Sequence, residues 1–197
     1  LGTSTFQGIW ADFMKGWRYT FTHPTLKWVI PTIVTSSILT WPVVDLMAGI
    51  ADHEFGRGVE ALAIFTSAQG LGAICGGLYL AHRKNSVGME TIFIRCVLLN
   101  GLFTAAFALT KTFWLAVPLF AASGLFMVIA GAGSQTVIQS LAAEDMRGRT
   151  LSIWYTLTRV GLATGALGLG TLSSLLGFTA PLTVSGLITA AAAAAIW

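Results

Sequence analysis

Charge is scarce in this chain, and its scarcity excludes most soluble folds. Only 10% of the 197 residues are charged and 55% are hydrophobic, with a mean hydropathy of +0.77, whereas a soluble domain is usually about 25% charged. The net charge of +3 is too small to indicate a nucleic-acid partner. The composition predicts an all-α, polytopic membrane protein with the lipid bilayer as its surroundings.

Cysteine and histidine are equally sparse, which excludes a disulfide framework and argues against a metal centre. Cys75 and Cys96 lie in separate apolar runs without the spacing of metal ligands. All three histidines fall at the ends of such runs, whereas an intramembrane serine protease needs a base within reach of its hydroxyl. We therefore expect no metal, no cofactor and no enzymatic activity.

A signal peptide is also lacking, because the first twenty residues are mixed and aromatic rather than basic and then apolar. The chain begins at Leu1 rather than at a methionine and ends inside an apolar run. We therefore expect it to be a piece of a longer protein.

Residues 1–26 form the first expected unit, an amphipathic helix followed by a linker. Apolar side chains recur there at helical spacing, with polar and charged residues between them, at Phe6, Ile9, Trp10, Phe13 and Trp17. Because tryptophan is favoured at the membrane–water interface, we expect this helix to lie in the interface. A soluble linker helix is the alternative. The helix should end at His23-Pro24, since the residue before proline disfavours helix.

Six apolar runs make up the second expected unit, residues 27–197. A membrane-spanning helix needs about 20 apolar residues, and each run is long enough. The runs lie near residues 27–50, 60–81, 91–110, 113–139, 150–175 and 178–197. Because the connections are short, neighbouring helices should be antiparallel.

The distribution of basic residues predicts the orientation of these spans. Basic residues gather before the first span, between the second and third, and between the fourth and fifth, at Lys15, Arg18, Lys27, Arg83, Lys84, Arg147 and Arg149. These places share one side if six helices alternate, and the other side has only Arg57 and Lys111. Loops rich in lysine and arginine face the cytoplasm. We therefore expect a multi-pass protein of the cell (inner) membrane with its basic loops in the cytoplasm.

Polar residues and glycines suggest that the six spans form two inverted three-helix repeats. The first and fourth runs are rich in serine, threonine, glutamine or proline, and the second and fifth are rich in glycine. Inverted repeats of this kind are typical of secondary transporters. The glycines at positions 70, 72, 76 and 77 and at positions 161, 165, 168 and 170 predict close helix contacts.

A short charged segment joins the fourth and fifth runs, and an arginine follows inside the fifth. The segment contains Glu144, Asp145, Arg147 and Arg149, and it predicts a gating loop at the bilayer surface together with Arg83 and Lys84. Arg159 lies nine residues beyond Thr150, which is roughly 13 Å into the span. Because charge is costly in hydrocarbon, Arg159 indicates either a cavity that meets an anionic or polar substrate or a structural contact.

Several polar residues join Arg159 as candidates for lining a cavity. The full set is Arg159, Tyr155, Gln135, Gln139, Ser134 and Gln69. Tyr155 precedes Arg159 by one turn, and Gln135 precedes Gln139 by one turn. Polar groups must find partners in a bilayer, so the alternative to a substrate pathway is a set of helix-to-helix hydrogen bonds.

Two further charged residues lie nearer to the ends of spans. Asp45 follows Pro42, which removes a backbone hydrogen bond and favours a bend. Asp45 is thus a candidate for proton coupling, with an interfacial acid as the alternative. Arg95 lies about one turn into the third run, where we expect it to reach the membrane surface or to pair with Glu90.

Two segments carry a resemblance to a known family. FMKGWRYTFTHPTLKW, residues 13–28, is similar to the run before the seventh helix in one branch of the major facilitator superfamily, and EDMRGRTLSIWY, residues 144–155, is similar to that branch's connection between helices ten and eleven. The branch includes enterobactin-exporter-like and macrolide-efflux-like proteins. A third superfamily signature, between helices eight and nine, is weaker, because His82 stands in place of its aspartate and Asn85 in place of its glycine.

The resemblance implies that the chain is the C-terminal six of twelve helices and that a missing N-terminal six-helix half is its partner. It also implies that the first and fourth spans face a central cavity, the second and fifth flank it, and the third and sixth face lipid. On this basis we expect a proton-coupled exporter of a small drug- or siderophore-like molecule that works by alternating access. A structural membrane domain that binds partner helices without transport is the alternative.

Overall fold

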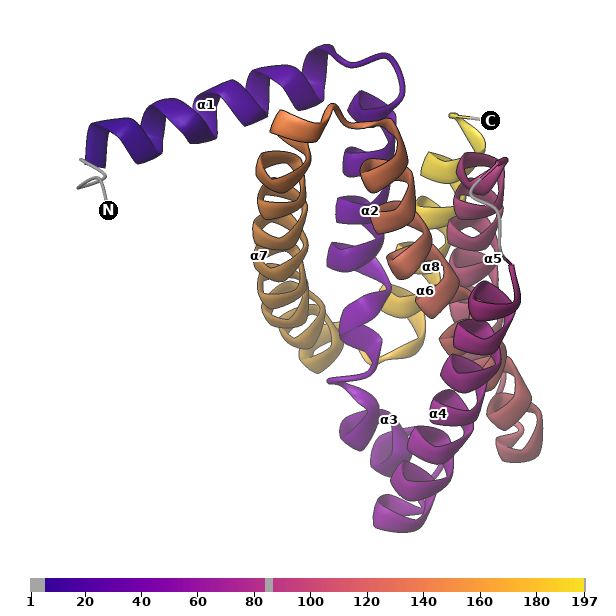
Figure 1. The fold of residues 1–197 in the computed structure, drawn as a ribbon. Helices are drawn as coiled ribbons and strands as arrows, with labels where there is room; N and C mark the ends of the chain where they lie inside the picture. The colour runs from indigo at the N-terminus through magenta and orange to yellow at the C-terminus, as the bar shows by residue number, and fades with distance from the viewer. Residues whose placement is uncertain (1–5, 84–86, 197) are drawn as a thin grey trace.

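The structure is a computed structural model that describes residues 6–83 and 87–196, and Figure 1 shows its fold. Within those residues all regular secondary structure is helical, as the composition predicts. The elements are α1 (Phe6–Thr22), α2 (Leu26–Leu39), the 3₁₀-helix η1 (Trp41–Val43), α3 (Met47–His53), α4 (Gly58–His82), α5 (Met89–Leu109), α6 (Phe113–Leu141), α7 (Glu144–Leu176) and α8 (Thr179–Ala194).

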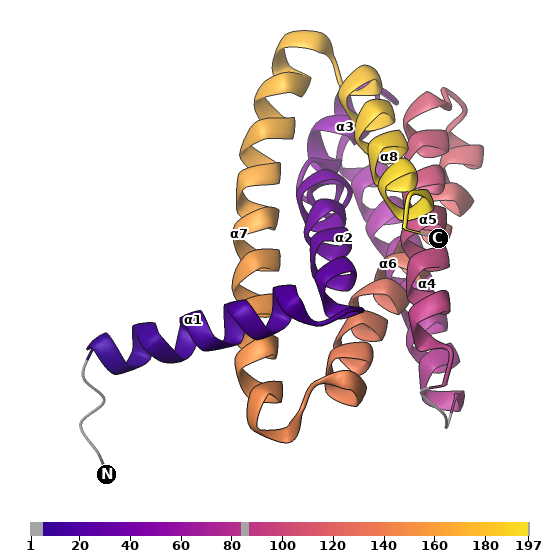
Figure 2. The same cartoon turned by 90° about the horizontal axis from the view of Figure 1, so that it is seen from above.

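Helix α1 lies across one end of the helix bundle rather than within it (Figures 1 and 2). It exposes Trp10, Met14 and Trp17, and it buries Thr20. The helix ends at Thr22, directly before the His23-Pro24 pair, so the predicted end is confirmed. Its place at a membrane interface stays a prediction. An amphipathic helix that lies across the end of a bundle is compatible with it.

The first predicted span is interrupted and bent. The segments Leu26–Val43 and Met47–His53 meet at an angle of 44°. Pro42 lies in the 3₁₀-helix at this break, where its missing N–H interrupts the helical hydrogen bonds. The predicted bend near Pro42 is therefore confirmed.

Three helices of the described residues, α4, α5 and α6, are long and apolar enough to cross a membrane, and the bent α2–α3 pair adds a fourth if it counts as one span. Helix α8 is apolar but has 16 residues. Helix α7 has 33 residues, with charged side chains in its first turns. A multi-pass helical membrane protein follows from these helices, whereas the count of six spans and the inverted repeat stay predictions.

Glycines set the closest contacts between helices. A Cβ atom on Gly72 of α4 would lie 1.9 Å from the carbonyl oxygen of Ala121 in α6, and one on Gly165 of α7 would lie 2.1 Å from that of Ile38 in α2. Other glycines of α4 and α7 have nothing within 4 Å of such an atom, namely Gly70, Gly77 and Gly168. The predicted close packing is thus confirmed for one face of each helix, and the remaining glycines face outward.

The buried core consists of two clusters, one toward each end of the bundle. The first includes Ile30, Phe93 and Ile138 and joins α2, α5, α6 and α7. The second gathers around Phe65 and Phe107, whose rings meet edge to face at 5.6 Å, and it joins α3, α4, α5, α6 and α8. Helices α5 and α6 both contribute to the two clusters and so connect them.

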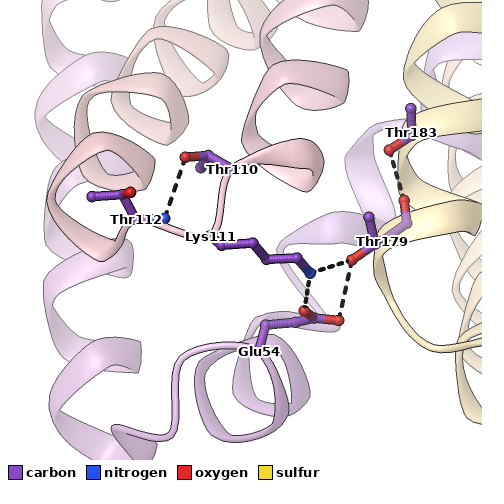
Figure 3. A network of polar contacts seen from close by, with 6 residues as sticks. All are labelled: Glu54, Thr110, Lys111, Thr112, Thr179 and Thr183. Atoms are coloured by element: carbon purple, nitrogen blue, oxygen red, sulfur yellow. Dashed lines mark hydrogen bonds and ion pairs between the residues drawn. The ribbon is translucent and has the colours of Figure 1, made fainter.

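The two ends of the bundle carry different connections. Figure 1 places α1, the α6–α7 connection and the C-terminus at one end, and α3 with the α7–α8 connection at the other. At the second end Lys111 Nζ donates to Glu54 Oε2 at 2.6 Å and to Thr179 Oγ1 at 2.7 Å (Figure 3). These contacts join the α5–α6 connection to α3 and α8.

The charged segment between α6 and α7 is helical. Helix α6 ends at Leu141 and α7 begins at Glu144, so just two alanines connect them. The prediction of a loop over this segment is wrong. Two acidic residues in the first turn of a helix interact favourably with its dipole, so Glu144 and Asp145 favour a helix start rather than a loop.

Candidate functional site

The predicted polar residues of α6 and α7 meet where these two helices face each other. The side chain of Tyr155 is 47% exposed, and its hydroxyl donates to Gln135 Oε1 at 3.3 Å. Gln139 lies one turn closer to the end of α6 and is exposed, as is Arg159, one turn beyond Tyr155. We call the set of Gln135, Gln139, Tyr155 and Arg159 the polar strip. It offers hydroxyl, amide and guanidinium groups on an accessible surface.

Ser134 supports the polar strip from behind. It is fully buried, and its hydroxyl accepts a hydrogen bond from Trp154 Nε1 at 3.0 Å and donates to the carbonyl oxygen of Gly131 at 2.7 Å. The ring of Trp154 meets that of Tyr155 edge to face, with centroids 4.8 Å apart. Of the two roles expected for Ser134, the geometry therefore matches a helix-to-helix hydrogen bond that positions Tyr155.

Arg159 lies near the middle of α7, on its outward face. Fifteen residues separate it from the helix start at Glu144, which is roughly 22 Å along the axis. The ion pairs found among the described residues do not include it. Because a guanidinium at this depth of a membrane helix needs water or an anionic group near it, Arg159 is the most informative member of the polar strip.

The two remaining candidates lie away from the polar strip. Gln69 is 9% exposed and packs between α4 and α6. Asp45 is exposed in the break between η1 and α3, and its neighbour Leu46 lies against Gly170 of α7. Since Gly170 is eleven residues beyond Arg159, Asp45 lies roughly 16 Å further along α7 than Arg159 does. The two charged candidates are therefore well separated.

Comparison with known proteins decides the family. A sequence profile described as transmembrane secretion effector, a family of the major facilitator superfamily, matches residues 5–197. The chain belongs to this family. No curated protein and no solved structure gives a match. The membership confirms the resemblance to the superfamily and supports a transporter with an export role rather than an enzyme, while the branch of exporters stays a prediction.

Potential metal ligands are dispersed in this secretion effector. Cys75 is exposed on α4 and Cys96 is buried on α5. Within residues 6–83 and 87–196, histidine, cysteine, aspartate and glutamate form no group of three or more that could hold a metal ion.

The charged residues predicted to gate the cytoplasmic end lie in two places. Arg83 follows α4 and donates to the carbonyl oxygen of Val87, and Lys84 lies outside the described residues. The others, Glu144, Asp145, Arg147 and Arg149, belong to the first turns of α7. Arg147 is half-buried there, and its Nε atom has no hydrogen-bond partner among the described residues. Any movement of α7 would therefore carry four of these six side chains with it.

Helix α1 fastens the start of α7, a contact that the sequence did not predict. Arg149 Nη2 pairs with Asp12 Oδ1 at 3.0 Å, and the backbone N–H of Ala143 donates to the hydroxyl of Tyr19 at 3.0 Å. A Cβ atom on Gly16 would lie 2.9 Å from that of Arg149, so the helices touch closely. Asp12 is an acidic residue within the otherwise basic and aromatic helix α1, and it was the sequence feature that could have indicated this contact.

Trp41 is a second residue that the sequence did not single out. It lies in η1, its indole Nε1 is buried, and this atom has no hydrogen-bond partner in the part of the chain that the structure describes. The ring lies beside Gly131 of α6, the residue whose carbonyl accepts from Ser134. The Trp41-Pro42 pair inside an apolar run was the available sign, because proline marks a break there.

Proposed function

We propose that this secretion effector is the C-terminal half of a proton-coupled exporter, in which the polar strip lines the path of a small substrate. Family membership supports the transport role. The observation that carries the proposal is the outward-facing guanidinium of Arg159 near the middle of α7, one turn from the Tyr155–Gln135 hydrogen bond. In this proposal a second six-helix half closes the other side of the path.

The chemistry of the polar strip favours a substrate with an anionic or strongly polar group. A guanidinium presents a planar fork of donors that suits a carboxylate or a similar oxyanion. Tyr155 and the two glutamines add neutral donors and acceptors that can hold hydroxyl or amide groups. The indole N–H of Trp41 has no hydrogen-bond partner among the described residues, and its ring lies beside Gly131, one turn before Gln135 on α6, so it is a further donor for this path.

Proton coupling in this proposal runs through Asp45. Since the carboxylate lies roughly 16 Å from the level of Arg159, the two groups do not exchange a proton directly. They are coupled if protonation of Asp45 and binding at the polar strip favour different conformations of the transporter. Asp45→Asn should then keep substrate binding and lose the dependence of efflux on the pH gradient.

The experiment that tests the proposal compares arginine variants of the full-length protein. Arg159→Ala should accumulate in the membrane at the normal level and lose efflux, whereas Arg159→Lys should keep part of it, because the charge remains and the fork is lost. Arg57→Ala, at the end of the bundle that holds α3, removes the same charge and should keep efflux. Normal efflux by Arg159→Ala would refute the role, and loss of the protein from the membrane would assign Arg159 to a structural contact.

The proposed orientation needs a separate measurement. With Cys75 and Cys96 replaced by alanine, a single cysteine at position 83 should resist an impermeant thiol reagent in intact cells, while one at position 111 should be labelled. Labelling at position 83 from outside would place the basic end of the bundle on the external side of the membrane and would contradict the proposed orientation.

A further inference from the structure

Arg95 gives the outward face of α5 a charge that the transport proposal does not use. It is the one basic residue in the α5 sequence, it is exposed, and it lies six residues after the helix start at Met89, roughly 9 Å along the axis. The same face continues with Leu102 and Leu109, which are 43% and 60% exposed. Such a face is apolar enough to meet lipid, except at this guanidinium.

Two apolar grooves flank Arg95. One, of about 480 Å³, is lined by Arg95 with Leu98, Leu99 and Ala194, and so lies between α5 and α8. The other, of about 340 Å³, lies toward α4 and α6 and includes Arg95, Leu99 and Tyr79. Both volumes fall within the range of ligand pockets, about 300–1,000 Å³. Arg95 and Leu99 belong to both grooves because they are one turn apart on the same helix face.

We propose that this surface is a binding site for an anionic phospholipid, with the headgroup phosphate on Arg95 and one acyl chain in each groove. The guanidinium offers charge-assisted hydrogen bonds to a phosphate, and its long side chain can reach the membrane interface from a position inside the span. The two grooves offer apolar surface on both sides of that charge. A phosphodiester with two chains matches this arrangement, whereas an inorganic phosphate would leave both grooves unused.

The acidic residue of α5 belongs to a different cavity from the two grooves beside Arg95. Glu90 lines a different cavity, of about 200 Å³, together with Pro24 and Trp28 between α2 and α5. Met89 and Ala194 place the site toward the end of the bundle that holds α1 and the C-terminus (Figure 1), which the basic residues assign to the cytoplasmic leaflet.

Native mass spectrometry of the purified full-length protein can measure this binding with two lipids that share the same chains, dioleoyl phosphatidylglycerol and dioleoyl phosphatidylcholine. The wild type should prefer the anionic lipid by roughly fivefold or more, the size expected for one basic side chain at a charged membrane surface. Arg95→Ala should reduce the preference to about one, and Arg95→Lys should keep part of it. Leu99→Trp, which fills both grooves and keeps the charge, should weaken the retention of both lipids.

Arg57→Ala is the matched control, because it removes the same charge at the other end of the bundle, where the guanidinium lies over the ring of Phe113 at 4.5 Å. It should keep the preference of the wild type. The proposal is wrong if Arg95→Ala retains the preference, if Arg57→Ala loses it equally, or if the wild type binds both lipids alike. A dimer that excludes lipid in the wild type and dissociates in Leu99→Trp would overturn it in favour of a second copy of the chain on this face.

Discussion

The contact between α4 and α6 allows the sharpest test of the packing, because two glycines of α4 differ in what surrounds them. A Cβ atom on Gly72 would lie 1.9 Å from the carbonyl oxygen of Ala121, whereas nothing lies within 4 Å of one on Gly70. Ordinary contact begins near 3.4 Å. Gly72→Ala therefore requires the two helices to separate locally by about 1.5 Å, and the obstacle is backbone, which cannot rotate away.

The expected energies follow from that geometry. Overpacking of a well-packed contact costs about 1–3 kcal/mol, and we expect the upper part of this range because α6 contributes to both core clusters. Alanine also has a helix propensity about 1 kcal/mol better than that of glycine. Gly72→Ala should thus lower the free energy of unfolding by about 2 kcal/mol, while Gly70→Ala should raise it by up to about 1 kcal/mol.

Unfolding of this chain by dodecyl sulfate in mixed micelles, followed by circular dichroism, gives both values under one condition. Gly76 and Gly77 form a second matched pair, since a Cβ on Gly76 would lie 2.7 Å from the carbonyl oxygen of Leu125 and one on Gly77 meets open space. If Gly72→Ala and Gly70→Ala unfold within about 0.5 kcal/mol of each other, the α4–α6 contact described above does not exist in the protein, because surface changes alone stay within that limit.

Three further variants test single contacts. Ser134→Ala should cost about 1–3 kcal/mol of unfolding free energy in the same assay, because it leaves the buried indole N–H of Trp154 without an acceptor. Asp12→Asn should change that free energy by less than about 1 kcal/mol, since both partners of its pair with Arg149 are partly exposed, yet it should increase hydrogen exchange in α1, which loses an attachment to α7. Lys111→Met should likewise cost about 1 kcal/mol or less, and proteolysis at the α5–α6 connection should become faster.

The helices themselves could be predicted closely from the sequence, because hydropathy and periodicity are local properties. The run expected at 60–81 is the helix Gly58–His82, and the run expected at 113–139 is the helix Phe113–Leu141. The bend at Pro42 followed from proline's missing donor. The predicted start of α7 was wrong because the dense group of charged residues was interpreted as a loop. Acidic residues are also favoured in the first turn of a helix.

The candidate site could be predicted only in part, because neighbouring residues of a helix face different directions. Ser134 and Gln135 are adjacent in the sequence and both polar, yet Ser134 is buried and accepts a hydrogen bond from Trp154, whereas Gln135 meets the hydroxyl of the exposed Tyr155. The sequence reveals polarity at both positions, but the partner helix decides which of them is accessible. The contact of α1 with α7 was beyond prediction for a related reason, since Asp12 and Arg149 are 137 residues apart.

Helix α7 connects these features mechanically. Its start is fastened to α1 through Arg149, one face is locked against α2 at Gly165, and its outward face carries Arg159. Helix α7 is a continuous helix of 33 residues, so we expect it to move as a unit. The neighbouring α2–α3 segment is broken and bent by 44°, so we expect its backbone near Pro42 to adjust when α7 moves. A substrate group that draws Arg159 toward it would then act on the α1 contact as well. Binding in the polar strip and attachment at the basic end are thus expected to be linked through one helix, and the Asp12→Asn and Arg159→Ala variants act on its start and on its middle.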